Sequence, residues 1–504
     1  MRIGIDFGTT RVVVAAADRG NFPLVNFETP DGQVREWFPP VAAVRGEERV
    51  YGWEAVAAQG DDEWTVLRSL KRWLRTAGPK TLVRVGAQEV PMRTLMAEMM
   101  TALRTQLMEN STLGAEPCEA LEVMLGVPAS ANSNQRFLTE EAAQDAGFAV
   151  LGLVNEPSAA AIEFAHRNSA ERKSRAGNGL VVYDLGGGTF DVSLVTLGET
   201  EHVVEAADGI AGLGGDDFDE ILAKLALEAA GETGALSAVE RYHLLEECRE
   251  KKETLNPNTR KVTVDLERVR AGWEQVTIPV EEYYERCRPL IEQTRDVVER
   301  LLAAHGDSAL DTLYVTGGAS ELPPVARILR ETFGRKVRRS SYMRSASAIG
   351  LAIRAAAMDD QLHDRLNQNF GIWREADHGG MIVFDLIFPR GVQLPAADEA
   401  PMCVERMYEP AHNIGHFRYL ECTRLDGDGQ PMGEITNWDQ VLFPFDPALQ
   451  QRGDLADVPV TRLENADGLK IHEIYSCDAS GRPRVKISAE PSGYEREFCL
   501  AQCG

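Results

Sequence analysis

The sequence has few cysteines, and they follow no regular spacing. Eight are scattered over 504 residues, with no CxxC pair and no cysteine–histidine ligand spacing. This pattern argues against a zinc site and against a disulfide framework. It favours reduced thiols in a cytoplasmic protein.

The chain is also short of positive charge and of long apolar runs. It has 53 Lys and Arg residues against 78 Asp and Glu, a formal net charge of −25. This balance argues against nucleic acid as a main partner, because phosphate backbones are bound by basic surfaces. No apolar run is long enough to span a bilayer, and the N-terminus MRIGIDFGTT does not resemble a signal peptide. We therefore expect a cytoplasmic location with no membrane partner.

Two glycine-rich turns of similar composition lie far apart in the chain. The first, Asp6-Phe7-Gly8-Thr9-Thr10, lies within the apolar segment Arg2–Ala17, and the second, Asp184-Leu185-Gly186-Gly187-Gly188-Thr189, lies within Gly179–Leu197. β-Branched residues on both sides of each turn predict a β-hairpin. The repeat of the same pattern predicts two related half-domains.

Other patterns place helices and strands between and after these hairpins. A proline at a plausible first helical position follows Asn155-Glu156, and Gly214-Gly215 precedes a helix. Apolar Leu313–Thr316 followed by Gly317-Gly318 predicts a strand, a turn and a helix. The remaining expectations are a helical stretch over about 51–110, a strand over 120–127 and a last alanine-rich helix to about 358.

The sequence pattern of the chain changes after residue 358, where helical periodicity ends. Residues 359–368 are polar and are interpreted as a linker, and from 369 to 504 short alternating strands are separated by Asp/Gly turns such as 426–429. This pattern predicts an all-β sandwich. The expected organisation is a domain over 1–358, a linker over 359–368 and a β-domain over 369–504.

The two turns suggest a phosphate site. A tight glycine-rich turn can point several backbone N–H groups at an anion, and glycine lets the chain approach it closely. Aspartates beside such turns fit Mg²⁺, which is held by few carboxylates and several waters when it accompanies a nucleotide. Asp and Gly are also ordinary turn residues, so one hairpin alone favours the simpler interpretation. Two matching hairpins favour the phosphate site.

These motifs, together with Asn155-Glu156-Pro157-Ser158, Gly214–Asp219 and Val315-Thr316-Gly317-Gly318, resemble the ATPase signatures of DnaK-type chaperones of the 70 kDa heat-shock family. The resemblance spans about 1–358 and continues more weakly to about 500. It implies an α/β fold, namely an actin-like ATPase of two related lobes followed by a β-sandwich. It also implies a divergent member, in which the C-terminal helical lid of the family is not expected.

The resemblance assigns roles to individual residues of this chain. The implied catalytic residues are Lys71, Glu156, Asp184 and Thr189. The implied Mg²⁺ ligands are Asp6, Asp184 and Asp191. The implied nucleotide-binding residues are Gly8, Thr9, Thr10, Gly186, Gly187, Gly188, Thr189, Gly214, Gly215, Lys252, Gly317 and Gly318. Judged from its local sequence alone, Lys71 is one base on a solvated helix face.

The chain departs from the family on the nucleoside side. After Gly317-Gly318 the family usually has an arginine, where this chain has Glu321, and an expected aspartate is replaced by Arg344. The linker is polar where the family has a run of Leu and Val, with Leu362 and Leu366 as its large apolar residues. Gly152 replaces an arginine that contacts J-domain proteins in the family.

The resulting expectation is a slow, Mg²⁺-dependent ATPase and chaperone that binds extended segments of unfolded client polypeptides through its β-domain. ATP and Mg²⁺ are the implied cofactors, and a J-domain co-chaperone and a nucleotide exchange factor are implied partners. The alternative is an ATP-gated scaffold with low turnover whose β-domain binds one dedicated partner. A small-molecule kinase is disfavoured because it would not explain the β-domain.

Overall fold

The structure is a computed structural model. It describes all residues except 62, 75, 79, 116–118, 130, 169–178, 198–200, 233, 306–309, 358–360, 364, 367, 377–380, 396–398, 439, 464–467 and 500–504. Part of the expected linker, at 359, 360, 364 and 367, therefore lies outside the described residues. So do Cys118, Cys503 and the side chain of Cys499. The cysteines described as free thiols are Cys248, Cys287, Cys403, Cys422 and Cys477.

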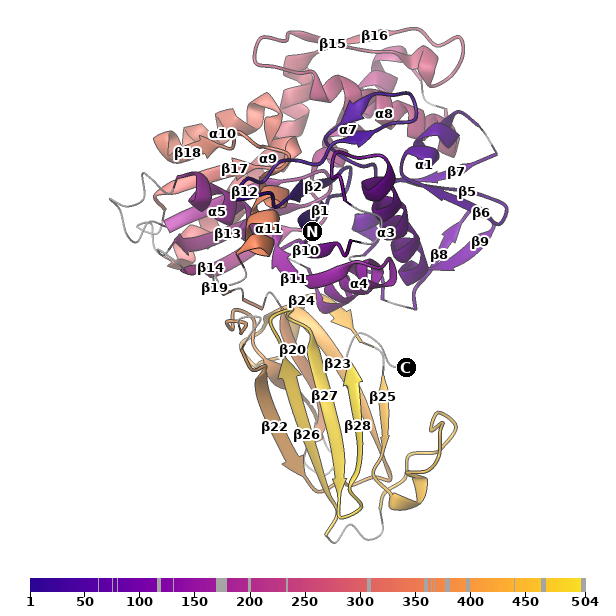
Figure 1. Ribbon diagram of the computed structural model, residues 1–504, viewed down its shortest axis with the longest axis vertical. Coiled ribbons are helices and arrows are strands. Elements are labelled where there is room, and N and C mark those ends of the chain that lie inside the picture. Colours follow the sequence, from indigo (N-terminus) through magenta and orange to yellow (C-terminus); the bar gives the residue numbers. More distant parts are fainter. Residues whose placement is uncertain are drawn as a thin grey trace. The chain divides into compact units, whose positions relative to one another are not determined.

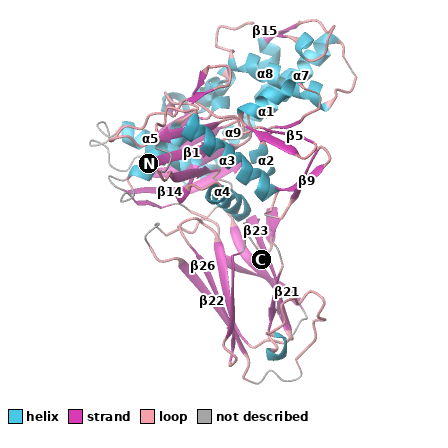
Figure 2. Ribbon diagram, turned by 45° about the vertical axis from the view of Figure 1, so that its right-hand side comes forward, coloured by secondary structure: helices cyan, strands magenta, loops and turns pink. Residues whose placement is uncertain are grey.

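The chain divides into two compact units. The first comprises Met1–Ser130 and Leu138–Gln361, and the second comprises Ala131–Phe137 and Leu362–Gly504. The first unit mixes helices and strands, whereas the second is built almost entirely of strands (Figure 2). Among the described residues, no helix has the length and apolar character needed to cross a membrane.

The first sheet of unit 1 has the strand order β11-β10-β1-β2. Its strands are β1 (Arg2–Phe7), β2 (Val12–Ala16), β10 (Glu122–Val127) and β11 (Ala149–Asn155). β1, β10 and β11 run parallel, so their carboxyl ends lie at one edge of the sheet. β1 and β2 form the expected first hairpin, with Asp6 opposite Val13.

The second sheet repeats this plan with the order β18-β17-β12-β13-β14-β19. Its strands are β12 (Gly179–Leu185), β13 (Phe190–Leu197), β14 (Glu201–Ile210), β17 (Thr312–Thr316), β18 (Val337–Arg339) and β19 (Gln361–His363). β12 and β13 form the second expected hairpin, and β17 runs parallel to β12. The two sheets confirm the expected pair of related lobes.

The side chains of β12 alternate between two cores. Val181, Tyr183 and Leu185 pack in one cluster with residues of α7 (Gly215–Ala230) and α9 (Val280–His305). Leu180 and Val182 pack in another cluster with residues of α5 (Glu156–Arg167) and α11 (Ala346–Ala356). Because alternate residues of a strand point to opposite faces, this sheet is covered by helices on both faces.

α5 and α11 pack at very short range. A Cβ atom placed on Gly350 of α11 would lie 1.8 Å from the Ala159 carbonyl oxygen of α5, and one on Gly4 of β1 would lie 2.3 Å from the Ala352 nitrogen. Only glycine fits at either position. The close packing of α11 brings the start of this helix to the edge where β1 ends.

The expected helical stretch over 51–110 is wrong in its middle. Among the described residues of this stretch, α-helix is confined to α1 (Trp53–Ala57), the short α2 (Leu70–Trp73) and α3 (Met92–Glu109). Between them lie β7 (Thr65–Leu67), β8 (Leu82–Val85) and β9 (Gln88–Pro91). β8 and β9 join through a turn with Gly86 at φ 59°, a conformation that favours glycine and ends any helix.

The remaining helices and strands of unit 1 complete its two lobes, and one of them, α4, has its residues 133–137 in unit 2. They are β3 (Phe27–Glu28), β4 (Val34–Arg35), β5 (Ala42–Arg45), β6 (Glu48–Tyr51), α4 (Ser133–Asp145), α8 (Ala238–Glu253), β15 (Lys261–Val264), β16 (Val276–Pro279) and α10 (Pro323–Phe333). α8 begins with a capping box in which Ser237 and Glu240 satisfy each other's backbone amides.

The second unit is the expected β-sandwich. One sheet comprises β21 (Met381–Phe388), β20 (Asn369–Ala376), β23 (Ile414–Leu425) and β24 (Pro431–Asn437), with β25 (Val441–Pro444) paired to β23. The other comprises β22 (Met402–Tyr408), β26 (Lys470–Cys477), β27 (Pro483–Glu490) and β28 (Tyr494–Cys499). In Figure 1 these strands carry the orange and yellow end of the colour scale. Aromatic rings of the two sheets pack against each other between them. The ring centroids of Tyr419 of β23 and Tyr475 of β26 lie 6.2 Å apart.

The end of the expected linker belongs to the second unit. The amide of Leu366 donates to the Val392 carbonyl (2.9 Å), and the amide of Gly391 donates to the Leu366 carbonyl (2.7 Å). The Leu366 side chain is buried. Leu366 therefore anchors the start of the β-sandwich. The preceding helix, α11, has already ended at Ala356.

Candidate functional site

The two glycine-rich turns line one pocket of the first unit. The pocket has an empty volume of about 860 Å³, which includes its open mouth. It lies at the carboxyl ends of parallel strands in both sheets, where open α/β sheets usually bind ligands. Its lining contains most of the residues predicted from the sequence: Asp6, Gly8, Thr9, Thr10, Lys71, Glu156, Asp184, Gly186, Gly187, Thr189, Gly215, Lys252, Gly317 and Gly318.

Three predicted residues lie behind the lining. A Cβ on Gly188 would meet the Thr9 hydroxyl at 2.6 Å, and a Cβ on Gly214 would lie 2.6 Å from the Gly187 carbonyl carbon. Asp191 is buried on β13, opposite Asp184 in the hairpin register. These residues shape and support the pocket wall and do not form its surface.

The start of α7, where the resemblance implies that Gly214 and Gly215 bind the nucleotide, uses its first amides within the protein. The amides of Gly215 and Asp216 donate to the carbonyls of Gly186 and Gly187 at 2.9 and 2.8 Å. The amide of Gly214 donates to the Asp217 carboxylate at 2.8 Å. The helix start therefore holds the second glycine-rich turn in place, and its first amides are already bonded within the protein.

Lys71 is buried, contrary to the simple reading of its local sequence. It lies on α2, whose flanking Ser69 donates to Asp216 (2.7 Å) and whose Arg72 donates to Asp217 (2.7 Å). These two bonds tie α2 to the first turn of α7 in the other lobe. The Lys71 ammonium group forms an ion pair with Glu156, the first residue of α5.

Negative charge is concentrated around this lysine. Burial, together with the Glu156 carboxylate and against the opposing effect of Lys71, raises the pKa of Asp6 to about 7. Burial raises the pKa of Asp184 well above its usual value, and Glu156, Asp6 and Asp191 add to the effect. Burial alone would lower the pKa of Lys71, but Glu156 and Asp6 outweigh it and the pKa is raised. The site therefore favours a cation beside the lysine.

This arrangement fits a hydrated Mg²⁺ held together with phosphate oxygens. Among the described residues, no group of three or more His, Cys, Asp or Glu side chains could hold a metal by itself. Mg²⁺ keeps several waters and is usually bound by one or two carboxylates plus substrate phosphates. Burial and the Glu156 carboxylate raise the pKa of both Asp6 and Asp184, and a cation between them would favour the ionised form of each.

Lys252, which also lines the pocket, is held in place by two contacts. Its ammonium group lies 2.7 Å from the Asp219 carboxylate and 2.7 Å from the Gly215 carbonyl. Burial raises the pKa of Asp219 to about 6, and Lys252 opposes this shift. The lysine thus connects α8 with the first turns of α7.

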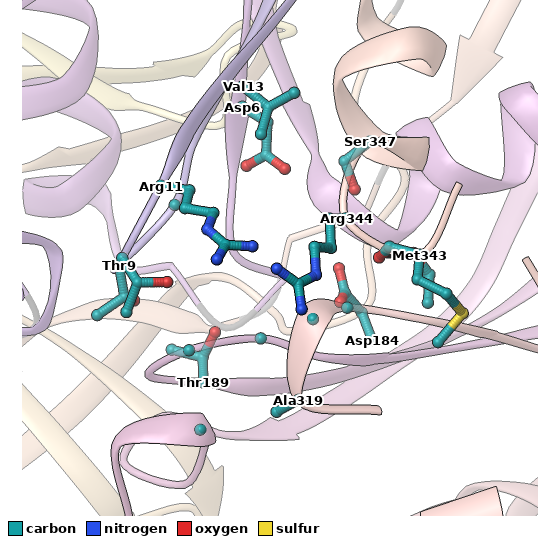
Figure 3. A pocket seen from close by; sticks show the side chains of 18 of the residues that line it. Asp6, Thr9, Arg11, Val13, Asp184, Thr189, Ala319, Met343, Arg344 and Ser347 are labelled. Atoms are coloured by element: carbon teal, nitrogen blue, oxygen red, sulfur yellow. Dashed lines mark hydrogen bonds between the residues drawn. The ribbon is translucent and has the colours of Figure 1, made fainter. Parts of the chain in front are cut away.

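The two residues that depart from the family meet as an ion pair. Arg344 Nε donates to Glu321 Oε2 at 2.8 Å, and Arg344 Nη1 lies 3.1 Å from Glu253 Oε2. Figure 3 shows the guanidinium groups of Arg344 and Arg11 both reaching the middle of the pocket, above Asp184 and Thr189.

Sequence reasoning missed several lining residues, among them Arg11, Arg249, Glu253, Asp219 and Ser347. Arg11 and Asp219 carried a local signal, because Arg11 directly follows Thr9-Thr10 in the first turn and Asp219 ends the Gly214–Asp219 motif. Glu253 and Arg249 lie in the regular helix α8, where charged residues are ordinary surface residues. Their position at the pocket follows from how α8 packs in the fold.

Comparison with known proteins agrees with this geometry. A sequence profile described as Hsp70 protein matches residues 2–366. The chain is 30% identical over 512 residues to the chaperone protein HscA of Klebsiella pneumoniae (strain 342), covering 97% of this chain and 78% of the relative. HscA of Escherichia coli O6:H1 is 31% identical with the same coverage.

A third relative is matched over a shorter length. The chaperone protein HscA homolog of Methylibium petroleiphilum is 31% identical over 423 residues, which span 78% of this chain and 65% of the relative. The profile match alone covers well over half of the chain. With two lobes joined at a phosphate-type pocket and a β-sandwich after them, the chain belongs to the Hsp70 family.

Proposed function

We propose that this protein is a Mg²⁺-dependent, slowly hydrolysing ATPase that acts as a molecular chaperone on unfolded polypeptide segments. The observation that carries the proposal is the meeting, in one pocket, of both glycine-rich turns with Asp6, Asp184 and the buried Lys71–Glu156 pair. These parts come from both lobes. They supply the donors, the acids and the buried cation that phosphoryl transfer to water requires.

Different residues of the pocket are proposed to bind the phosphates, to stabilise developing charge and to orient the attacking water. Gly8, Thr9, Thr10 and Thr189 offer donors for phosphate oxygens, and close approach is possible because the turns carry glycine. Lys71 lies where its positive charge can stabilise negative charge that develops on the transferred group. Glu156 orients the Lys71 ammonium group and, with Asp6 and Asp184, offers acceptors for the attacking water.

A bound Mg²⁺ would neutralise phosphate charge when the nucleotide is present. Asp6 and Asp184 border the pocket and would hold the ion, largely through its waters, and Asp191 lies behind them as a supporting charge. Because the donor set is small, the ion is expected to bind firmly only together with the nucleotide.

The β-sandwich is the proposed site for client polypeptides. β21 and β22 lie at the edges of their two sheets and carry the exposed Met381, Ile382 and Met407. Extended peptides commonly bind sheet edges through main-chain hydrogen bonds, with apolar contacts for selectivity. The relatives' name, chaperone protein HscA, supports the same assignment.

The test is ATP turnover by the full purified chain with Mg²⁺, with and without an unfolded polypeptide. We expect slow turnover that the polypeptide accelerates. No turnover above the rate of a Lys71→Met variant would refute the ATPase proposal. Binding to a peptide array separates the chaperone from an ATP-gated scaffold, because a chaperone accepts many apolar sequences and a scaffold accepts one partner.

A further inference from the structure

A second cavity lies in the first unit and shares no described lining residue with the nucleotide pocket. Its empty volume is about 1010 Å³, which includes its open mouth, and a space of this size can hold a small molecule. Its walls come mainly from the segment 20–26, which follows β2, from the last turns of α5, and from α11 with Tyr342 in the turn before it.

The wall formed by the segment 20–26 is held in place by hydrogen bonds of its backbone. The amide of Val25 donates to the Val14 carbonyl of β2 at 2.8 Å. The amide of Asn26 donates to the Thr112 hydroxyl at 2.9 Å, and the amide of Thr112 donates back to the Asn26 carbonyl at 2.9 Å. The cavity is therefore formed before any ligand enters, as is usual for small-molecule sites.

Two buried acceptor atoms of the cavity lack a donor among the described residues. The Glu163 side chain is 0% exposed, and its Oε2 accepts from the Tyr314 hydroxyl at 2.5 Å. Its Oε1 accepts no hydrogen bond, and Arg167 Nη1 lies 3.6 Å from it, beyond hydrogen-bond distance. The side-chain oxygen of Asn26 is likewise buried without a donor. Because a buried acceptor without a donor is unfavourable, the cavity favours a ligand that donates hydrogen bonds.

The charges of the lining favour a ligand that is positively charged. The described lining carries two carboxylates, Glu36 and Glu163, and one guanidinium, that of Arg167. His166 adds no charge in its neutral form. The Arg167 side chain is 43% exposed, and its guanidinium lies 4.8 Å over the Tyr342 ring. A carboxylate as buried as that of Glu163 needs a hydrogen-bonded cation, so one added positive charge would complete the site.

Apolar side chains line the cavity together with these acceptors. Ile349 and Ile353 lie four positions apart on α11, so they share one face of the helix. Phe22 and Leu24 line the cavity from the segment after β2, and the Tyr342 ring is 42% exposed. These surfaces fit the apolar body of a ligand whose polar end reaches Glu163.

We propose that this cavity binds a small organic amine whose protonated amino group donates to Glu163 Oε1. The side-chain oxygen of Asn26 is a further acceptor, and the apolar body of the amine packs against Ile349, Ile353 and Phe22. Hydrogen bonds between an ammonium group and a carboxylate are stronger than those between neutral groups, which makes Glu163 the main determinant of affinity. The site is separate from the nucleotide pocket, so the proposal does not depend on ATP hydrolysis.

The experiment titrates the full purified chain with phenethylamine by calorimetry at pH 7, alone and with saturating ATP and Mg²⁺. We expect saturable binding of one amine per chain, which ATP does not displace. 3-Phenylpropionate, an anion of similar size, is expected not to bind. Absence of saturable amine binding would mean that the cavity holds only water, and displacement by ATP would place the amine in the nucleotide pocket. Either result would overturn the inference and leave the proposed function intact.

Two variants test the lining residues. Glu163→Gln keeps an acceptor for Tyr314 and removes the charge, so it should weaken phenethylamine binding by about tenfold or more. Tyr342→Ala, at an exposed position that leaves the core unchanged, should also weaken binding because one wall of the cavity is lost. Glu89→Gln, at an exposed position outside the cavity, is the matched control. Unchanged affinity in both cavity variants, or an equal loss in the control, would refute the assignment.

Discussion

The ammonium group of Lys71 and the carboxylate of Glu156 form a buried ion pair between residues 85 positions apart in the chain. Lys71 reaches the pair from the four-residue helix α2, and Glu156 reaches it as the first residue of α5. The side chains are 7 and 9% exposed, so water reaches neither group freely and each lies against a group of opposite charge. We therefore expect a change in this pair to affect both the stability of the protein and its ATP turnover.

Removing one partner of this pair should cost both stability and turnover. Lys71→Met leaves a buried carboxylate without its cation, a change that typically destabilises by about 3–5 kcal/mol. The double variant Lys71→Met, Glu156→Gln should recover much of that loss and still hydrolyse no ATP. Urea unfolding and ATP turnover measure the two effects. A single variant as stable as the wild type would contradict the buried pair.

The second hairpin should be essential for hydrolysis. Asp184→Asn or Thr189→Ala should lower ATP turnover by more than about tenfold with the fold intact, as loss of one transition-state contact commonly does. Thr263→Ala is the matched control, because Thr263 lies on the exposed hairpin β15–β16. Unchanged turnover in both pocket variants would remove these residues from the catalytic machinery.

Gly214 should be needed for the close fit between α7 and the phosphate turn. A Cβ at Gly214 would lie 2.6 Å from the carbonyl carbon and oxygen of Gly187, so Gly214→Ala must push the turn aside. We expect nucleotide affinity to fall by about tenfold or more, since the donors of the turn lose their position. Gly234→Ala, with nothing within 4 Å of the added carbon, is the control. Calorimetric titration measures the nucleotide affinity of both variants. Equal affinities would contradict the proposed need for glycine at position 214.

Asp219 should give stability a pH dependence. Burial raises its pKa from 3.8 to about 6 in the folded protein, with Lys252 opposing the shift. A raised carboxyl pKa adds stability that is fully present below about pH 4 and is lost as pH rises through about 6. The stability of the wild type relative to Asp219→Asn should therefore fall between pH 4 and 6 and level off above. Urea titrations at pH 4, 5, 6 and 7 measure this difference, and a constant difference would contradict the shift.

Leu366 should stabilise the β-sandwich. Its side chain is 7% exposed, and its backbone bonds to Val392 and Gly391. Leu366→Ala should destabilise the second unit by about 2–5 kcal/mol, the usual cost of truncating a buried leucine. Hydrogen exchange of strands β20–β27 reports the loss, and Leu82→Ala, at an exposed position, is the control. A variant with wild-type exchange would show that the segment is only a tether.

The sequence by itself determined the local features of this protein. The two hairpins follow from β-branched runs around Asp–Gly–Thr turns, and the β-sandwich follows from period-two alternation between Asp/Gly turns. These patterns repeat within a few residues, so neighbouring side chains suffice to specify them. Between 61 and 91 the helical prediction was right only for the short α2 (Leu70–Trp73), and the strands β7, β8 and β9 form in the rest of the described segment.

The tertiary structure decided the contacts within the pocket and those of its lining residues that the sequence did not predict. The local sequence of Lys71 suggested a surface base, although the family resemblance implied a catalytic role, and in the structure Lys71 is buried against Glu156. The N–H groups of Gly215 and Asp216 hold the neighbouring turn. Glu253, Arg344 and Arg11 come from elements that are distant in sequence and ordinary in composition. Contacts of this kind depend on how two sheets and their helices pack, and no spacing along the chain encodes them.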